Sequence, residues 1–153
     1  MKFVLGILLL FFSTIIGYFL ASKYIDRKKF YNDFINFNQL LKQQILFNKR
    51  TLIEIIKEQK NDSEFYLVLQ NGIINKRYDA NFNYLNKDDV VFFSSYLKSL
   101  GTSDIDTQID FINKTNEILV VKFNQALEYE KKYKTLYIKM GFLIGLMLMI
   151  IVL

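Results

Sequence analysis

Two uncharged apolar segments lie at the two ends of the sequence and enclose a polar stretch of more than a hundred residues. The first runs from Phe3 to Ala21 and the second from Met140 to Leu153. As helices they would measure about 28 Å and about 21 Å, against a hydrocarbon core of about 30 Å. This pattern predicts a transmembrane helix over residues 1–22, a helical domain over 23–139 and a second transmembrane helix over 140–153.

Each apolar segment has an alternative interpretation. The first could be a secretory signal peptide, but its apolar run is long, and cleavage after Ala21 would put bulky Phe19 where a small residue is preferred. The second could be a buried core helix. Its sequence, GFLIGLMLMIIVL, is apolar on every face, and a basic helix leads into it with Tyr137 and Lys139 placed to reach the interface. Both segments therefore favour membrane spans.

The beginning of the middle region predicts two helices. The first carries an apolar stripe at helical spacing: Phe30, Phe34, Phe37, Leu41 and Ile45. It is interrupted at 48–50. Thr51 then opens a second helix, because Thr51 and Glu54 have the spacing of a capping box. This helix ends near 60–62.

A third helix is predicted through residues 65–69, with Asp62 or Ser63 as its N-cap. By residue type this run could also form a strand, but it has helices on both sides and no partner strand. Residues 71–86 contain Asn71-Gly72 and many Asn, Asp and Tyr residues. We expect this stretch to be rich in loops.

The end of the middle region predicts two more helices. One begins at Asp88 or Asp89 and ends at Gly101, a residue type that favours helix C-termini. Ser103 is predicted to cap the last helix, which exceeds forty residues when it is continued into the final apolar segment. The expected fold class is all-α, an antiparallel helical bundle flanked by N- and C-terminal transmembrane helices.

The positive charge of the chain is concentrated beside the apolar segments. The formal net charge is +5, yet residues 30–127 contain eleven Lys and Arg against twelve Asp and Glu. The domain-side basic residues next to the segments are Lys23, Arg27, Lys28, Lys29, Lys131, Lys132, Lys134 and Lys139. The positive-inside rule then predicts a cytoplasmic middle domain, with an exported one as the alternative. These residues are predicted to contact anionic membrane lipids, and we expect no nucleic-acid partner.

Small residues recur every four positions in both apolar segments. They are Ser13, Gly17 and Ala21 in the first, and Gly141 and Gly145 in the second. Small residues allow helices to approach closely in lipid, and in an antiparallel hairpin these positions lie at matching depths. We predict that the two segments pair through these faces; pairing with a helix of another protein is the alternative.

The sequence offers little equipment for catalysis. It contains no Cys and no His, which excludes thiolate nucleophiles, histidine bases and the usual zinc sites. Asp106 and Asp110 share a helix face and could hold a cation, but a solvated capping turn is the simpler interpretation. We expect no enzymatic activity, cofactor, metal or small-molecule substrate. Transport of ions or lipids is disfavoured because neither apolar segment contains a charge.

Short motifs give the chain a resemblance to a known family. The strongest comprises Leu100, Gly101, Ser103, Asp104 and Gln108, and a second is the block 133–153 with its Gly-x-x-x-Gly spacing. Nearly end to end, the chain resembles the stage III sporulation protein AB family. It departs at Thr51, where the family usually has Pro, and it matches poorly over 65–86.

This resemblance implies a non-enzymatic membrane platform similar to the inner-membrane platform proteins of type II secretion. The protein would lie on the mother-cell side of the outer forespore membrane and belong to the channel complex that links mother cell and forespore. Its partners would be other channel subunits and an ATPase-like cytoplasmic protein. The alternative is a general membrane-tethered helical adaptor of a secretion or pilus-like assembly.

Overall fold

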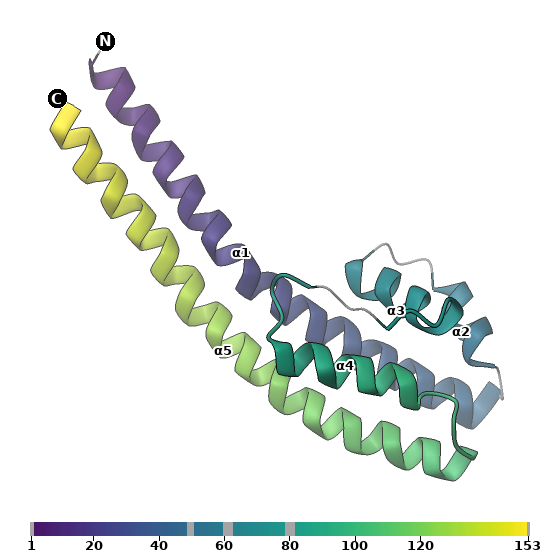
Figure 1. The fold of residues 1–153 in the computed structure, drawn as a ribbon. Coiled ribbons are helices and arrows are strands. Elements are labelled where there is room, and N and C mark those ends of the chain that lie inside the picture. The colour runs from purple at the N-terminus through teal and green to yellow at the C-terminus, as the bar shows by residue number, and fades with distance from the viewer. Residues whose placement is uncertain (1, 49–50, 60–62, 79–81, 153) are drawn as a thin grey trace. The chain divides into compact units, whose positions relative to one another are not determined.

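The computed structural model describes residues 2–48, 51–59, 63–78 and 82–152, and in these ranges it contains helices and no strand (Figure 1). The elements are α1 (Lys2–Gln43), a π-helical turn η1 (Gln44–Asn48), α2 (Leu52–Glu58), α3 (Glu64–Ile74), α4 (Lys87–Ser99) and α5 (Ile105–Val152). The predicted all-α fold is confirmed, and the 48 residues of α5 confirm that the last helix exceeds forty.

The chain divides into two compact units, to which α1 and α5 both contribute. Unit 1 consists of residues 1–29 and 124–153, and unit 2 of residues 30–123. These limits lie inside the boundaries predicted at 22/23 and 139/140, because contacts between α1 and α5 in unit 1 continue past the uncharged segments. The positions at which the chain would enter a bilayer stay a prediction.

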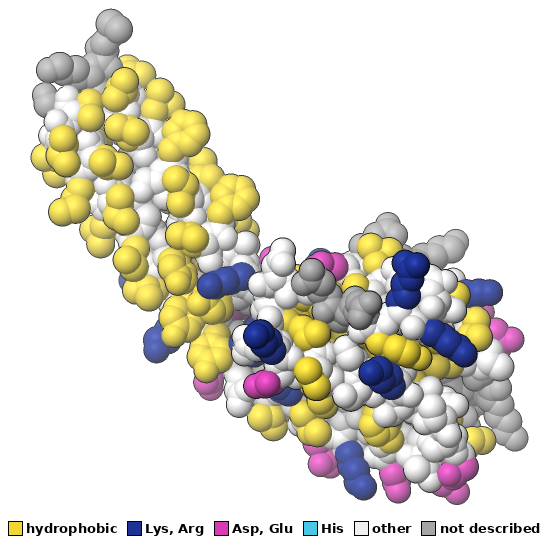
Figure 2. All heavy atoms as spheres, in the orientation of Figure 1, with side chains coloured by type: hydrophobic (Ala, Val, Ile, Leu, Met, Phe, Trp, Pro, Cys, Tyr) yellow, Lys and Arg dark blue, Asp and Glu magenta, His cyan; other side chains and the backbone are white. Residues whose placement is uncertain are grey.

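In unit 1 the first part of α1 runs antiparallel to the last part of α5, so both termini lie at one end of the unit (Figure 1). Both helices are long and apolar enough to cross a membrane, and only 11% of the most apolar window of each is buried. That low burial disfavours a buried core helix for the C-terminal segment. Figure 2 shows hydrophobic side chains over the visible face of this pair, with Lys and Arg side chains first appearing toward the end away from the termini.

The core of unit 2 is largely aromatic. Phe30 lies at its centre, with ring centroids 5.4 Å from Phe65, 5.0 Å from Phe82 and 5.3 Å from Phe93. These pairs are close to edge-to-face, which is the arrangement that the ring quadrupoles favour. The buried apolar side chains around them include Tyr31, Phe34, Phe37, Leu41, Ile55, Ile56, Leu69, Tyr96, Leu97, Ile112 and Leu119.

The segment that could have been a strand is helix α3. Its buried residues are Phe65, Tyr66, Leu69 and Gly72, a spacing that places them on one face of a helix but on both faces of a strand. The expectation that residues from 71 onward form a loop is wrong at its start, because α3 continues to Ile74. Gly72 packs against α4: a Cβ there would lie 2.8 Å from Leu97 Cδ1.

The helix starts agree with the predictions at two places and differ at two. The backbone N–H of Thr51 donates to Glu54 Oε2 at 3.0 Å, which confirms the capping box. Ser63 precedes α3 as its N-cap, whereas Asp62 lies outside the described residues, as does the predicted break at 60–62. Helix α4 begins at Lys87 after an Asn86 N-cap, slightly earlier than predicted.

The start of α5 is the second difference, because Ser103 was predicted to cap this helix. Asp104, and not Ser103, immediately precedes the helix, and its Oδ2 accepts the backbone N–H of Thr107 at 3.3 Å. A carboxylate at this position also interacts favourably with the helix dipole. Ser103 lies one residue too early to reach the free N–H groups of the first turn.

A buried polar network joins three helices inside the aromatic core. Asn38 on α1 is fully buried, and its Nδ2 donates to the Ile112 carbonyl on α5 at 2.9 Å. The Tyr96 hydroxyl on α4 donates to Asn38 Oδ1 at 3.0 Å. Burial raises the pKa of Tyr96, which keeps its hydroxyl protonated as a donor. One side chain thereby fixes the positions of α4 and α5 against α1.

The network predicts a stability effect for Asn38→Ala. The substitution leaves the Tyr96 hydroxyl buried without its acceptor, so the free energy of unfolding should fall by about 1–3 kcal/mol. Urea unfolding of the full chain in detergent micelles, followed by near-ultraviolet circular dichroism, measures it. Asn36→Ala, at an exposed position on the same helix, is the matched control. Equal stability of the two variants would contradict a role for the network.

Candidate functional site

The two helices of unit 1 touch through their backbones at two glycines. A Cβ on Gly17 would lie 2.5 Å from the Tyr137 carbonyl oxygen and 3.3 Å from Gly141 Cα. A Cβ on Gly141 would lie 2.7 Å from the Ser13 carbonyl oxygen. No side chain larger than hydrogen fits either position without separating the helices, so the close approach requires glycine at both.

The line of close contact between α1 and α5 that contains Gly17 and Gly141 is called the glycine seam below. The other predicted packing residues lie along this seam. The Ser13 hydroxyl donates to the Gly141 carbonyl at 2.6 Å, and Ala21 is fully buried. A Cβ on Gly145 would come within 2.9 Å of Leu10 Cα. The structure therefore brings all five residues together between α1 and α5. Gly6 continues the seam against Met149 and was not singled out from the sequence.

Beyond the glycines, the seam becomes aromatic and then charged. The Tyr24 ring stacks on Tyr133 with centroids 4.7 Å apart. Burial and a hydrogen bond with Tyr137 raise the pKa of Tyr24. Lys28 Nζ lies 2.7 Å from Glu130 Oε2, and Lys134 Nζ lies 3.8 Å from the other oxygen of the same carboxylate. Glu130 is therefore a buried carboxylate held by one cation from each helix.

All eight predicted interface cations lie in unit 1. Tyr24 and Lys28 of α1 contact Tyr133 and Glu130 of α5. The basic clusters at 23–29 and 131–139 therefore lie at the same height along the pair of helices. Lys23 and Lys132 lie over the rings of Tyr24 and Tyr133, at 5.1 Å and 5.5 Å from the ring centroids. Positive side chains thus flank the aromatic level of the seam, an arrangement suited to anionic headgroups.

The five residues of the family-like motif form the turn between α4 and α5 in unit 2. Leu100 is the C-cap of α4, and Gly101 follows with φ +72°, a conformation that favours glycine. Gln108 reaches back from α5, where its Oε1 accepts the Gly101 backbone N–H at 3.0 Å and the Ser103 hydroxyl at 3.3 Å. Hydrogen bonding from Thr107 lowers the pKa of the capping carboxylate of Asp104.

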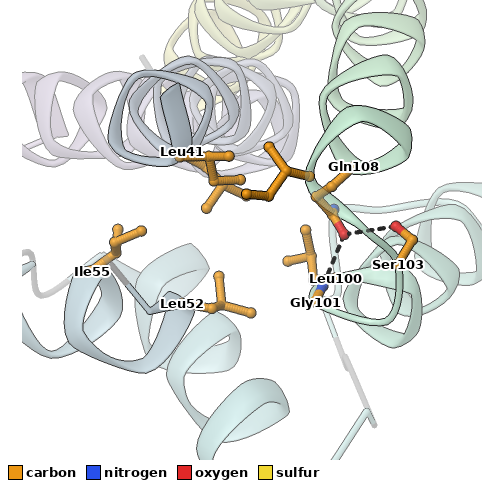
Figure 3. A pocket seen from close by; sticks show the side chains of 9 residues that line it. Leu41, Leu52, Ile55, Leu100, Gly101, Ser103 and Gln108 are labelled. Atoms are coloured by element: carbon orange, nitrogen blue, oxygen red, sulfur yellow. Dashed lines mark hydrogen bonds between the residues drawn. The ribbon is translucent and has the colours of Figure 1, made fainter. Parts of the chain in front are cut away.

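Beside this turn lies an apolar pocket of about 240 Å³. It is lined by Leu41, Ile45, Leu52, Ile55, Leu100, Gly101, Ser103, Ile105 and Gln108. Figure 3 shows Leu41, Leu52 and Ile55 facing the Gln108 amide across it. The Nε2 atom of Gln108 is buried and has no hydrogen-bond partner among the described residues.

Three features of these regions were not predicted as site elements. Glu130 and Asn38 are polar residues within otherwise apolar helix stripes, and that interruption is the signal that could have marked them. The pocket has no comparable signal, because its residues come from α1, η1, α2, the α4–α5 turn and the start of α5, which are far apart in sequence.

Three acidic residues have clear structural roles. Asp89, which is 3% exposed, pairs with Lys122 Nζ at 2.7 Å. Asp104 caps α5, and Glu130 belongs to the seam of unit 1. Within the described ranges no group of three or more acidic side chains is placed to hold a metal ion.

The model of the stage III sporulation protein AB family matches the chain in two overlapping segments, which cover residues 2–67 and 59–153. The chain belongs to this family. Its role is accordingly in sporulation. No curated protein and no solved structure matches the chain. The match includes residues 65–86, where the motif resemblance is weakest.

The glycine seam predicts a cross-link within this sporulation protein. In the chain carrying Gly6→Cys and Met149→Cys, the two Cβ atoms lie about as far apart as the 3.7 Å that separates a Cβ on Gly6 from Met149 Cβ, which suits a disulfide. Oxidation in membranes should therefore give a disulfide within one monomer. Adding Gly141→Leu should weaken the pairing by roughly 1–3 kcal/mol through overpacking and reduce the cross-linked fraction on non-reducing gels.

Tyr18→Leu, at a position 51% exposed, is the control and should leave the yield unchanged. Cross-linked dimers in place of cross-linked monomers would show that the segments pair between molecules and would contradict the intramolecular seam.

Proposed function

We propose that this protein is a non-enzymatic membrane platform subunit of the mother cell–forespore channel complex needed for endospore formation. Residues 1–22 and 140–153 anchor it, and residues 23–139 lie in the cytoplasm of the mother cell. The observation that carries the proposal is the glycine seam of unit 1, where two otherwise exposed apolar helices close on each other in a chain of this family.

The arrangement of charge supports the orientation. Eight basic residues lie at one level of the helix pair, on the side of both apolar segments away from the termini. Positive residues of short flanking segments stay on the cytoplasmic side of a membrane. The two helices therefore agree on one topology, in which both termini lie across the outer forespore membrane.

The use of its polar groups supports a role in assembly. The best-placed carboxylates are engaged in a helix cap or an ion pair: Asp104, Asp89 and Glu130. The long helices α1 and α5 and the aromatic core provide a scaffold. By resemblance to secretion platforms, unit 2 docks an ATPase-like protein, and the remaining surfaces contact other channel subunits.

Deletion of the gene tests the proposal. Loss of heat-resistant spores with normal vegetative growth is expected, and expression of the intact chain should restore sporulation. Affinity purification of the tagged chain from sporulating cells should recover channel subunits and an ATPase-like protein. Normal spore formation with no such recovery would contradict the proposal, and expression throughout vegetative growth would favour the general adaptor.

The orientation has its own test in Asn83→Cys. Asn83 is exposed in unit 2, and the chain has no other cysteine. A membrane-impermeant thiol reagent should fail to label intact cells and should label the same cells after permeabilisation. A cysteine added before Phe3 is the matched control: in vegetative cells made to express the chain, where both termini would face the outside, it should be labelled without permeabilisation. Labelling of Asn83→Cys in intact cells would place the middle domain outside the cytoplasm.

A further inference from the structure

A basic groove runs along α5 in unit 1. It has a volume of about 480 Å³ and is lined by Glu130, Lys131, Lys134, Thr135, Ile138 and Lys139. The lining carries three cations and one carboxylate, and Lys28 of α1 already pairs with that carboxylate at 2.7 Å. Among the described residues, neither Lys131 nor Lys139 has an ion-pair partner. The groove therefore has an excess of positive charge that these parts of the chain do not neutralise.

The groove lies between two rows of side chains on one face of α5. Residues four apart on a helix lie one above the other, so one row is Lys131, Thr135 and Lys139, and the other is Glu130, Lys134 and Ile138. The first row places a hydroxyl between two lysines. Side chains on a helix lean toward its N-terminus, so Lys139 leans toward Thr135. An anion at Thr135 would therefore meet an O–H donor and an ammonium donor from the same row.

The two ends of the groove lie at different depths. Gly17 lies inside the uncharged segment 3–21 and contacts α5 at Gly141. Lys139 precedes Gly141 by two residues, so it lies at a depth where α1 has no charge. Lys131 lies about 12 Å further toward unit 2 along the helix. Because the polar interface of a bilayer is about 5–8 Å thick on each side, the groove extends from the headgroup region to the edge of the hydrocarbon core.

Beyond Lys139 the same row of α5 becomes apolar. Leu143, Met147 and Ile151 follow at the same spacing and are 59%, 68% and 79% exposed. A ligand that covers the whole row therefore has an anionic group at one end and a long apolar chain at the other. A free anion or an acidic protein segment has no such chain. Anionic phospholipids have both parts, and basic pockets on transmembrane helices bind their headgroups.

We propose that this groove binds one anionic phospholipid. The lipid phosphate accepts hydrogen bonds from the Thr135 hydroxyl and from Lys139 Nζ. Lys131 and Lys134 face the rest of the headgroup, and one acyl chain lies along the apolar continuation of the row. The inference assigns a single site to one helix face, which a general attraction between basic flanks and membranes does not require. It rests on the proposed function in one respect, namely that residues 140–153 lie in a membrane.

The test uses the full chain in dodecyl maltoside micelles, labelled at the isoleucine δ-methyl groups. Dioleoyl-phosphatidylglycerol is the probe, and Ile138 reports on the groove by methyl NMR. A saturable shift is expected. Dioleoyl-phosphatidylcholine has the same chains and no net charge, so at least about tenfold more of it should be needed. Ile16, exposed on α1 in the other apolar segment, reports changes of the micelle and should respond alike to both lipids.

Two matched pairs of lysine substitutions separate the groove from general charge attraction. Lys131→Gln with Lys139→Gln should weaken binding of phosphatidylglycerol about tenfold or more. Lys23→Gln with Lys29→Gln removes the same charge from the basic cluster of α1, and in about 0.15 M salt it should weaken binding about twofold at most. All four side chains are exposed, so neither pair disturbs the packing of the helices.

Thr135→Val tests the hydroxyl at nearly constant side-chain volume. The substitution removes an O–H donor to a charged acceptor, so binding of phosphatidylglycerol should weaken about threefold or more. Thr14→Val on α1 is the matched control. The Thr14 hydroxyl donates to the Leu10 carbonyl within its own helix, so this variant should bind the lipid normally.

Equal weakening by the two lysine pairs, unchanged binding to Thr135→Val, or equal titrations with the two lipids would each overturn the proposal. A saturable Ile138 shift with inorganic phosphate at the same concentrations would indicate a site for free anions and would also overturn it. So would a saturable shift with the peptide acetyl-Glu-Glu-Glu-Glu-amide and none with lipid, which would indicate an acidic protein segment. Because lipid binding is measured on the purified chain, it can fail while deletion still blocks sporulation, and it can succeed while deletion does not.

Discussion

Unit 1 depends on the contact between the backbones of α1 and α5 at Gly17 and Gly141. Within lipid, apolar side chains gain nothing by leaving the bilayer for each other, so helix association depends on close packing and hydrogen bonds. The missing Cβ atoms of the two glycines allow the close packing, and the Ser13 hydroxyl donates a hydrogen bond across the helices to the Gly141 carbonyl. This contact also sets the register: a slip of one turn, about 5.4 Å, would separate Tyr24 from Tyr133 and Lys28 from Glu130.

Unit 2 uses a different balance of forces, although the same two helices run through it. Its core of Phe and Tyr rings gains stability mainly from burial, which has little directional preference. Direction comes from Asn38, which binds Ile112 on one helix and Tyr96 on another. Satisfied buried polar groups of this kind favour one alignment among the many that an aromatic core would accept. Polar anchors thus fix both units, at Ser13 in one and at Asn38 in the other.

The features that the sequence predicted correctly are those encoded locally. Helical spacing gave the all-α fold and the length of α5, and the capping box at Thr51 follows from two residues three apart. The errors have two sources. Gly72 has the residue type of a loop, but in the structure it lies in α3 and packs against the distant Leu97. The prediction of Ser103 as the cap of α5 failed by a single residue, and helix ends vary by one or two residues. The pocket is a property of residues from four elements, so no local pattern encodes it.

The turn between α4 and α5 depends on one side chain, that of Gln108. The N–H of Gly101 requires a buried acceptor, and a neutral amide provides it without placing a charge among Leu41, Leu52 and Leu100. The same choice introduces an N–H pair that the turn cannot use. Oε1 is directed to Gly101 and Ser103, and Nε2 is buried without a partner among the described residues. The turn thus gains a fixed acceptor for Gly101 and carries one buried donor without a partner, which costs about 1–3 kcal/mol.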